Sequence, residues 1–199
     1  MWRRVKSFIS NSLKRRQSPH TGDRDSLNYF KLGTQYYVAG RFGTFAGFLP
    51  ASGNLFHHAV EMFLKGDLCQ TESRVVLKSY GHRLKRLWKA YKRKHQGIDL
   101  AGYDKVISQL EKFERIRYPD DITDRGLIGA IAISGSAPIA ERVTPISAGL
   151  PRYSLIVNNV DDLVRAIFEA TSRNPSFFFT GMSTDGKAFL YKDNTSFTP

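Results

Sequence analysis

NLFHHAVEMFLKGDL, residues 54–68, is the stretch from which the architecture of this chain can be worked out. Its apolar side chains cover roughly two-thirds of a helical wheel, more than the stripe of an ordinary surface helix. The remaining wedge holds His57, His58, Glu61 and Lys65. We therefore expect a central helix, surrounded by other helices, that carries these four residues as one polar seam.

Three interpretations of the adjacent histidines are open: a metal site, a catalytic pair or a structural seam. His57 and Glu61 are four residues apart and can share a helical face, as metal ligands do. The helix itself supplies no third ligand, however, and the HExxH order of zinc proteases is absent. Glu61 and Lys65 have the same spacing and can neutralise each other, while the histidines bond to neighbouring helices. We favour the structural seam and expect neither a metal nor a cofactor.

The chain has 199 residues, of which 41% are hydrophobic, so a single domain with a substantial core is expected. Its one cysteine, Cys69, cannot form an internal disulfide, and we expect a reducing, cytoplasmic setting. No apolar run reaches the roughly 18 residues of a membrane span. We therefore expect no transmembrane insertion, and the N-terminus shows no signal-peptide core.

The net charge of +12 is concentrated in two segments. Residues 1–20 contain six Lys or Arg and no acid, and residues 71–96 contain nine against the single acid Glu72. Localised positive charge favours RNA or another polyanion as a partner. An anionic membrane surface, an acidic protein partner and a merely solvated basic face remain open as alternatives.

A first helix is predicted over residues 25–48, where Gly33, Gly40 and Gly47 recur every seven residues. Glycine costs roughly 1 kcal/mol in a helix interior, so the spacing predicts a face that another backbone approaches closely. We expect that neighbour in the same bundle, although a second copy of the chain would also fit. A further helix is predicted over residues 101–116 from its apolar periodicity.

A third amphipathic helix is predicted over residues 75–95. Its apolar stripe includes Leu84, Trp88 and Tyr91, and we assign the two aromatic residues to the core. The opposite face is densely cationic and is the expected nucleic-acid contact. It comprises Lys78, Arg83, Lys85, Arg86, Lys89, Lys92 and Arg93.

Beyond residue 120 the pattern changes. GLIGAIAI (126–133) and RYSLIV (152–157) predict short extended segments in an irregular or β insertion over about residues 121–158. A helix is predicted over residues 160–171, with Asn159 or Asp161 as its N-cap.

A C-terminal hairpin is predicted where FFFTGM (177–182) and KAFLYK (187–192) flank Asp185-Gly186. The expected organisation is a basic arm (1–22), a helical domain (23–175) and a C-terminal hairpin or tail (176–199).

Four stretches of this chain resemble the HEPN domains (higher eukaryotes and prokaryotes nucleotide-binding). They are YYVAGRF (36–42), the seam helix, YGHRLKRLW (80–88) and RIRYPDD (115–121), in the right order over about residues 25–120. The resemblance implies a four- or five-helix up-and-down bundle that commonly dimerises. It also implies that the Glu61/Lys65 helix is a structural hallmark.

Many members of that family are metal-independent ribonucleases, often toxins or defence factors, that use an Arg followed after four to six residues by a His. The one formal match here, Arg15 to His20, lies in the N-terminal arm. The resemblance and the basic helix together predict a non-catalytic module that binds nucleic acid or nucleotide. The alternatives are a protein-interaction module that dimerises through the glycine face and a ribonuclease with an unusual site. The candidate residues of that unusual site are His82, Arg83, His57, His58 and Arg41.

Overall fold

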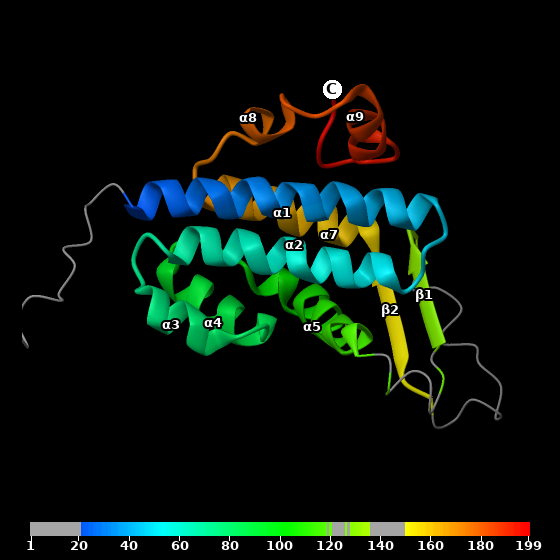
Figure 1. Ribbon diagram of the computed structural model, residues 1–199, viewed down its shortest axis with the longest axis horizontal. Coiled ribbons are helices and arrows are strands. Elements are labelled where there is room, and N and C mark those ends of the chain that lie inside the picture. Colours follow the sequence, from blue (N-terminus) through cyan, green and yellow to red (C-terminus); the bar gives the residue numbers. More distant parts are fainter. Residues whose placement is uncertain (1–20, 119, 121–125, 127, 136–149) are drawn as a thin grey trace, which may run out of the picture.

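Two long helices side by side form the spine of the molecule (Figure 1). The computed structural model describes residues 21–118, 120, 126, 128–135 and 150–199, so the predicted basic arm, apart from its last two residues, lies outside the described part. α1 spans Thr21–Phe45 and α2 spans Ala51–Leu68. The helix expected over residues 54–68 is confirmed and starts three residues earlier. No helix in the described ranges combines the length and the apolar character that crossing a membrane requires.

Glycines on α1 set its close approach to α2. A Cβ atom on Gly33 would lie 2.8 Å from the Phe63 ring and 3.1 Å from the Ala59 carbonyl oxygen, and one on Gly40 would lie 2.9 Å from the Phe56 ring. The predicted close face is therefore confirmed at two of its three glycines, and the neighbour belongs to the same chain. Gly47 lies beyond α1, in the turn to α2, where its φ of +77° suits glycine.

The basic segment forms two helices, α3 (Arg74–Tyr80) and α4 (Leu84–Lys94), packed below α2 in Figure 1. The prediction of one continuous helix is wrong because Gly81, with φ +59°, ends α3. Trp88 and Tyr91 are buried, as expected for core residues.

The next predicted helix is present in shortened form. α5 spans Asp104–Lys112 and is flanked by the 3₁₀ turns η1 (Ala101–Tyr103) and η2 (Phe113–Arg117). Its apolar stripe is buried as predicted, with Val106, Leu110 and Phe113 all inside the core.

A small parallel sheet confirms the two predicted extended segments. β1 (Ile128–Ala132) pairs with β2 (Arg152–Ile156), with Ile128 opposite Arg152. β2 leads directly into α7 (Val157–Ala170). The predicted caps Asn159 and Asp161 are wrong, because both residues lie inside α7.

The C-terminal β-hairpin prediction is also wrong: this segment forms α8 (Pro175–Phe179) and α9 (Thr184–Tyr191), which lie across α1 (Figure 1). The Asn174 side chain accepts a hydrogen bond from the Ser176 N–H, and Ser183 accepts one from Gly186. Each is an N-cap, and the expected turn residues Asp185-Gly186 instead form the first turn of α9. The fold is mainly helical with a small two-stranded parallel sheet.

A buried ion pair ties this C-terminal layer to α1. The fully buried Arg41 guanidinium pairs with the buried carboxylate of Asp161 on α7. It also donates from Nε to the Phe189 carbonyl at 3.0 Å and from Nη2 to the Lys192 carbonyl. Tyr37 donates to the same carboxylate. One guanidinium thus connects α1, α7 and α9.

The packing at Gly33 predicts the outcome of Gly33→Ala. The added methyl group would meet both a ring and a backbone oxygen, so we expect a loss of about 1–3 kcal/mol in the free energy of unfolding, measured by urea denaturation. Gly22→Ala, in the first turn of the same helix, is the matched control because its Cβ would meet nothing closer than 3.7 Å. Equal stability of the two variants would contradict the close-packing account.

The ion pair predicts a larger effect for Asp161→Asn. Removing the charge leaves Arg41 buried and uncompensated, which should cost about 3–5 kcal/mol of unfolding free energy. Glu169→Gln, on the same helix, removes a carboxylate from an exposed pair with Arg165 and should change stability by no more than about 0.5 kcal/mol. Similar denaturation midpoints for the two variants would show that the buried pair contributes no more to stability than the exposed pair.

Candidate functional site

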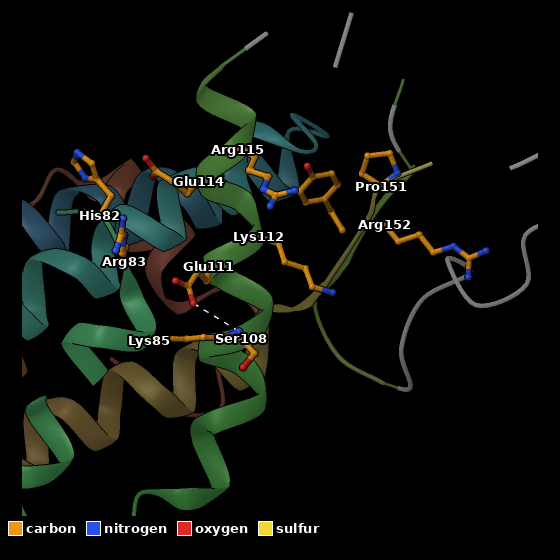
Figure 2. A pocket seen from close by; sticks show the side chains of 11 residues that line it. His82, Arg83, Lys85, Ser108, Glu111, Lys112, Glu114, Arg115, Pro151 and Arg152 are labelled. Carbon is orange, nitrogen blue, oxygen red and sulfur yellow. Dashed lines mark ion pairs between the residues drawn. The ribbon is translucent and has the colours of Figure 1, made fainter. Parts of the chain in front are cut away.

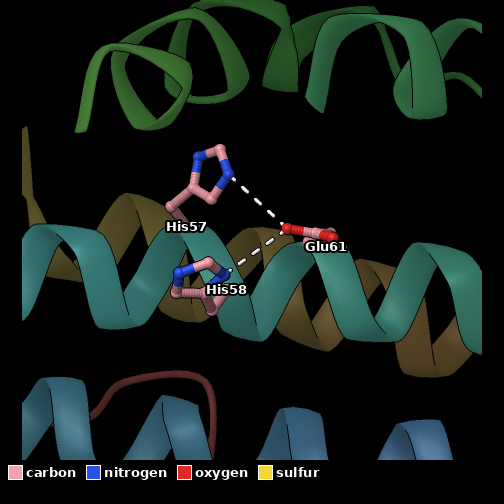
Figure 3. A group of neighbouring side chains, drawn as sticks. All are labelled: His57, His58 and Glu61. Atoms are coloured by element: carbon pink, nitrogen blue, oxygen red, sulfur yellow. Dashed lines mark ion pairs between the residues drawn. The ribbon is translucent and has the colours of Figure 1, made fainter. Parts of the chain in front are cut away.

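The predicted seam residues converge on the buried carboxylate of Glu61. Lys65 donates to Oε1 at 2.6 Å, and His58 Nδ1 lies 3.4 Å from Oε2. His57 Nε2 lies 3.7 Å from the same Oε2 (Figure 3). Three polar side chains therefore surround the carboxylate of a fourth residue of the same helix, in the interior of the protein.

His82 joins this cluster from outside α2. It lies in the turn between α3 and α4, and its Nδ1 is 3.0 Å from Glu61 Oε2 and 3.1 Å from Oε1. The helical periodicity of residues 75–95 had predicted His82 among the basic residues of one long helix. Gly81 is the sequence signal that could have corrected this placement. A glycine can end a helix, and the residue after it then no longer follows the helical periodicity.

His57 is buried without a complete set of hydrogen bonds. Its Nδ1 lies 3.1 Å from the Leu110 carbonyl oxygen, which can only accept, so Nδ1 carries the proton. Nε2 then has a free lone pair and no hydrogen-bond partner. It faces Glu114 Oε2 at 3.2 Å and Glu61 Oε2.

The protonation states follow from these surroundings. Burial lowers the pKa of His57 to about 4, so the ring is neutral near pH 7. Burial acts to raise the pKa of Glu61, but hydrogen bonds from His58 and Lys65 outweigh it and bring the value to about 2. Ligand-type atoms of His57, His58 and Glu61 all lie within 4.8 Å of one another, which is a spacing that a metal ion can use.

A cavity of about 890 Å³ opens beside the cluster, and His82 and Glu114 form part of its wall (Figure 2). Most of its charged lining is positive and comes from three parts of the chain: the start of α4, the α5–η2 segment and β2. The cationic side chains are those of Arg83, Lys85, Lys112, Arg115 and Arg152. Lys112, Arg115 and Arg152 did not belong to the predicted basic surface, because they reach the cavity through long-range packing.

The predicted basic residues lie on the surface as expected. Arg83, Arg86, Lys89 and Arg93 are exposed and form no ion pair within the described residues. Two others have carboxylate neighbours: Lys92 lies 2.8 Å from Asp104, and Lys85 lies 3.8 Å from Glu111. Lys78, also exposed, belongs to α3 rather than α4.

The five residues considered for a displaced catalytic site are not all brought together. His57, His58 and His82 share the Glu61 carboxylate, and Arg83 lines the adjoining cavity. Arg41 instead makes its polar contacts with α7 and the α9 region.

Comparison with known proteins leaves the family open: no family model, curated protein or solved structure matches this chain.

The contacts of Glu61 predict a coupled effect on stability. Glu61→Ala leaves the largely buried Lys65 ammonium without its partner and should cost about 1–3 kcal/mol of unfolding free energy. Adding Lys65→Met should recover part of that loss, because the unpaired charge is then removed. Urea denaturation with EDTA present measures both variants free of any metal contribution. Strictly additive losses would contradict a direct Glu61–Lys65 pairing.

Proposed function

We propose that this protein binds nucleic acid, RNA in the first place, without cleaving it. The observation that carries the proposal is the set of five cationic side chains that line one open cavity. The lining also holds the carboxylates of Glu111 and Glu114, which leaves an excess of positive charge that an anion would balance. Phosphate groups are the natural complement of such a site, because guanidinium and ammonium groups bind their oxygens strongly.

The start of α4 adds to the attraction for phosphate. No side chain caps this helix at Arg83, and its N-terminal end lies at the cavity. Free N–H groups and the helix dipole favour negative charge at such an end. The cavity is therefore attractive to a phosphate through its backbone as well as through its side chains.

The cationic surface continues beyond the cavity, which favours a polymer over a single nucleotide. Lys85 lines the cavity and also belongs to the exposed side of α4. Arg86, Lys89 and Arg93 follow along that side at helical spacing. A mononucleotide in the cavity would leave these three charges unused, whereas a phosphate chain can contact both regions.

The expected mode of recognition is contact with the phosphate backbone. Trp88 and Tyr91 are buried in the core and stack on each other, so neither can stack on a base. Contacts to phosphate alone give affinity that depends strongly on salt and little on sequence.

A HEPN-like bundle is part of this proposal. The α1–α2 pair carries YYVAGRF and NLFHHAVEMFLKGDL on facing helices, with the Glu61–Lys65 pair that the resemblance leads us to expect. α7 would be the last helix of this bundle. The glycine face of α1 is covered by α2, so dimerisation through that face is less favoured.

A ribonuclease is the second candidate because His82, 47% exposed, lies at the cavity beside Arg83. The family spacing of Arg and His is absent from this part of the chain, so we propose binding alone. RNA recovered intact after incubation supports this choice. Cleavage that His82→Ala abolishes would establish the alternative.

Charge reversal tests the binding surface. Lys112→Glu with Arg115→Glu in the cavity, and Lys89→Glu with Arg93→Glu on α4, should each weaken RNA binding. Each pair should also flatten the slope of log affinity against log salt by roughly 0.7–0.9 per lost phosphate contact. Fluorescence anisotropy at several salt concentrations measures both quantities.

The matched control is Arg24→Glu with Lys31→Glu, which reverses two exposed charges on α1. It changes the net charge by the same amount and should leave the salt slope nearly unchanged. Equal weakening by all three pairs would reduce the effect to overall charge. Absence of binding by the unmodified protein at about 50 mM salt, where such contacts are strong, would refute the proposal.

A further inference from the structure

The histidine cluster has the dimensions of a metal site. Tetrahedral zinc with bonds of about 2.0–2.1 Å to nitrogen and oxygen places its ligand atoms roughly 3.3 Å apart. Glu61 Oε2 lies 3.0 Å from His82 Nδ1, 3.4 Å from His58 Nδ1 and 3.7 Å from His57 Nε2. The described residues whose ligand atoms all lie within 4.8 Å of one another include His57, His58 and Glu61 but not His82.

Two buried atoms in the cluster lack any donor. His57 Nε2 and Glu114 Oε2 have no hydrogen-bond partner, yet they lie 3.2 Å apart. Both present lone pairs to each other when Nδ1 of His57 donates to Leu110. Two facing acceptors in the interior are unfavourable, and a cation bound between them and Glu61 would resolve the conflict.

Hydrogen bonds around the cluster orient its side chains in the way that metal ligands are usually oriented. A metal-binding histidine usually donates its other ring N–H to a carbonyl or carboxylate, as His57 does to Leu110. Lys65 holds the second oxygen of Glu61 and leaves Oε2 for the ion. His82 and Glu114 line the cavity, which gives an ion a route from solvent.

From these observations we propose that His57, His58 and Glu61 bind one divalent transition-metal ion, with His82 and Glu114 beside it. Imidazole nitrogens with a carboxylate favour Zn²⁺ over Ca²⁺ or Mg²⁺, which prefer all-oxygen sites. From the sequence the metal interpretation was not favoured, because α2 alone offered too few ligands. The structure brings ligand atoms of His57, His58 and Glu61 within 4.8 Å of one another, and His82 and Glu114 approach this group from outside α2. The metal site does not depend on nucleic-acid binding.

The test uses the full chain, freed of metal with a chelator and then titrated with Zn²⁺. We expect one ion per chain by elemental analysis after dialysis, and a melting temperature that rises with added Zn²⁺. Co²⁺ in place of Zn²⁺ should give the intense visible absorption of a tetrahedral nitrogen and oxygen site. Competition with a chromophoric chelator gives the affinity.

Two variants and one matched control decide the assignment. His58→Gln removes a ligand and should weaken Zn²⁺ binding by on the order of 100-fold or more. His82→Gln removes a contact to the Glu61 carboxylate and should weaken binding by about 10–100-fold. His82 is the most exposed residue of the cluster, so its variant should fold, and circular dichroism checks this. His95→Gln is the control, because His95 pairs with Asp67, a different buried carboxylate of α2.

Less than one Zn²⁺ per chain in the unmodified protein would overturn the proposal. An affinity that is unchanged in either His58→Gln or His82→Gln, or one that falls equally in His95→Gln, would also overturn it. In each of those cases the facing acceptors at His57 would have to be resolved by a proton instead.

Discussion

The burial of α2 on nearly all sides is the constraint on which the rest of this structure depends. α1 covers one face so closely that Gly33 and Gly40 leave no room for side chains. An ionised carboxylate in that interior is tolerated only if neighbouring groups supply charge and hydrogen bonds. Lys65, His58 and His82 meet this requirement at Glu61. The position of the α3–α4 turn is therefore linked to the charge on a single α2 side chain.

Local periodicity identified those parts of the fold that depend on near neighbours in the sequence. The apolar residues that cover most of the helical wheel of residues 54–68 indicated the buried helix and its polar seam. The glycines that recur every seven residues indicated the closely packed face of α1. The parallel strands were indicated by two apolar runs, although their pairing was not. In each case a pattern only a few residues long indicates whether one face of a helix or strand is buried.

The features that were missed depend on competing local signals or on distant contacts. Gly81 is compatible with an amphipathic stripe, yet its left-handed backbone divides that stripe into two helices. Asp185-Gly186 matches a hairpin turn, but Ser183 caps a helix there instead. Arg152 lines the cationic cavity because β2 packs against α5. No local pattern reports a pairing between residues so far apart in the chain.

The Glu61 carboxylate lies deeper in the protein than the candidate cavity. Five cationic side chains and the carboxylates of Glu111 and Glu114 line the cavity, while the ionised Glu61 lies behind His82 in the interior. A phosphate at the cavity would therefore meet the guanidinium and ammonium groups first, and His82 stands between it and the carboxylate. The two proposed sites, one for a polyanion and one for a metal ion, would therefore occupy neighbouring parts of the protein without direct competition.

The anchor at Arg41 has a consequence for synthesis on the ribosome. Its carboxylate partner Asp161 lies 120 residues later, and the Lys192 carbonyl lies 151 residues later. At about 5–20 residues per second, roughly 6–30 seconds separate the synthesis of Arg41 from that of these partners. During that interval α1 and α2 can pair, but the guanidinium must stay hydrated on the surface that α7 and α9 later cover. The face of the nascent α1–α2 hairpin that carries Arg41 is therefore covered only after α7 and α9 have been synthesised.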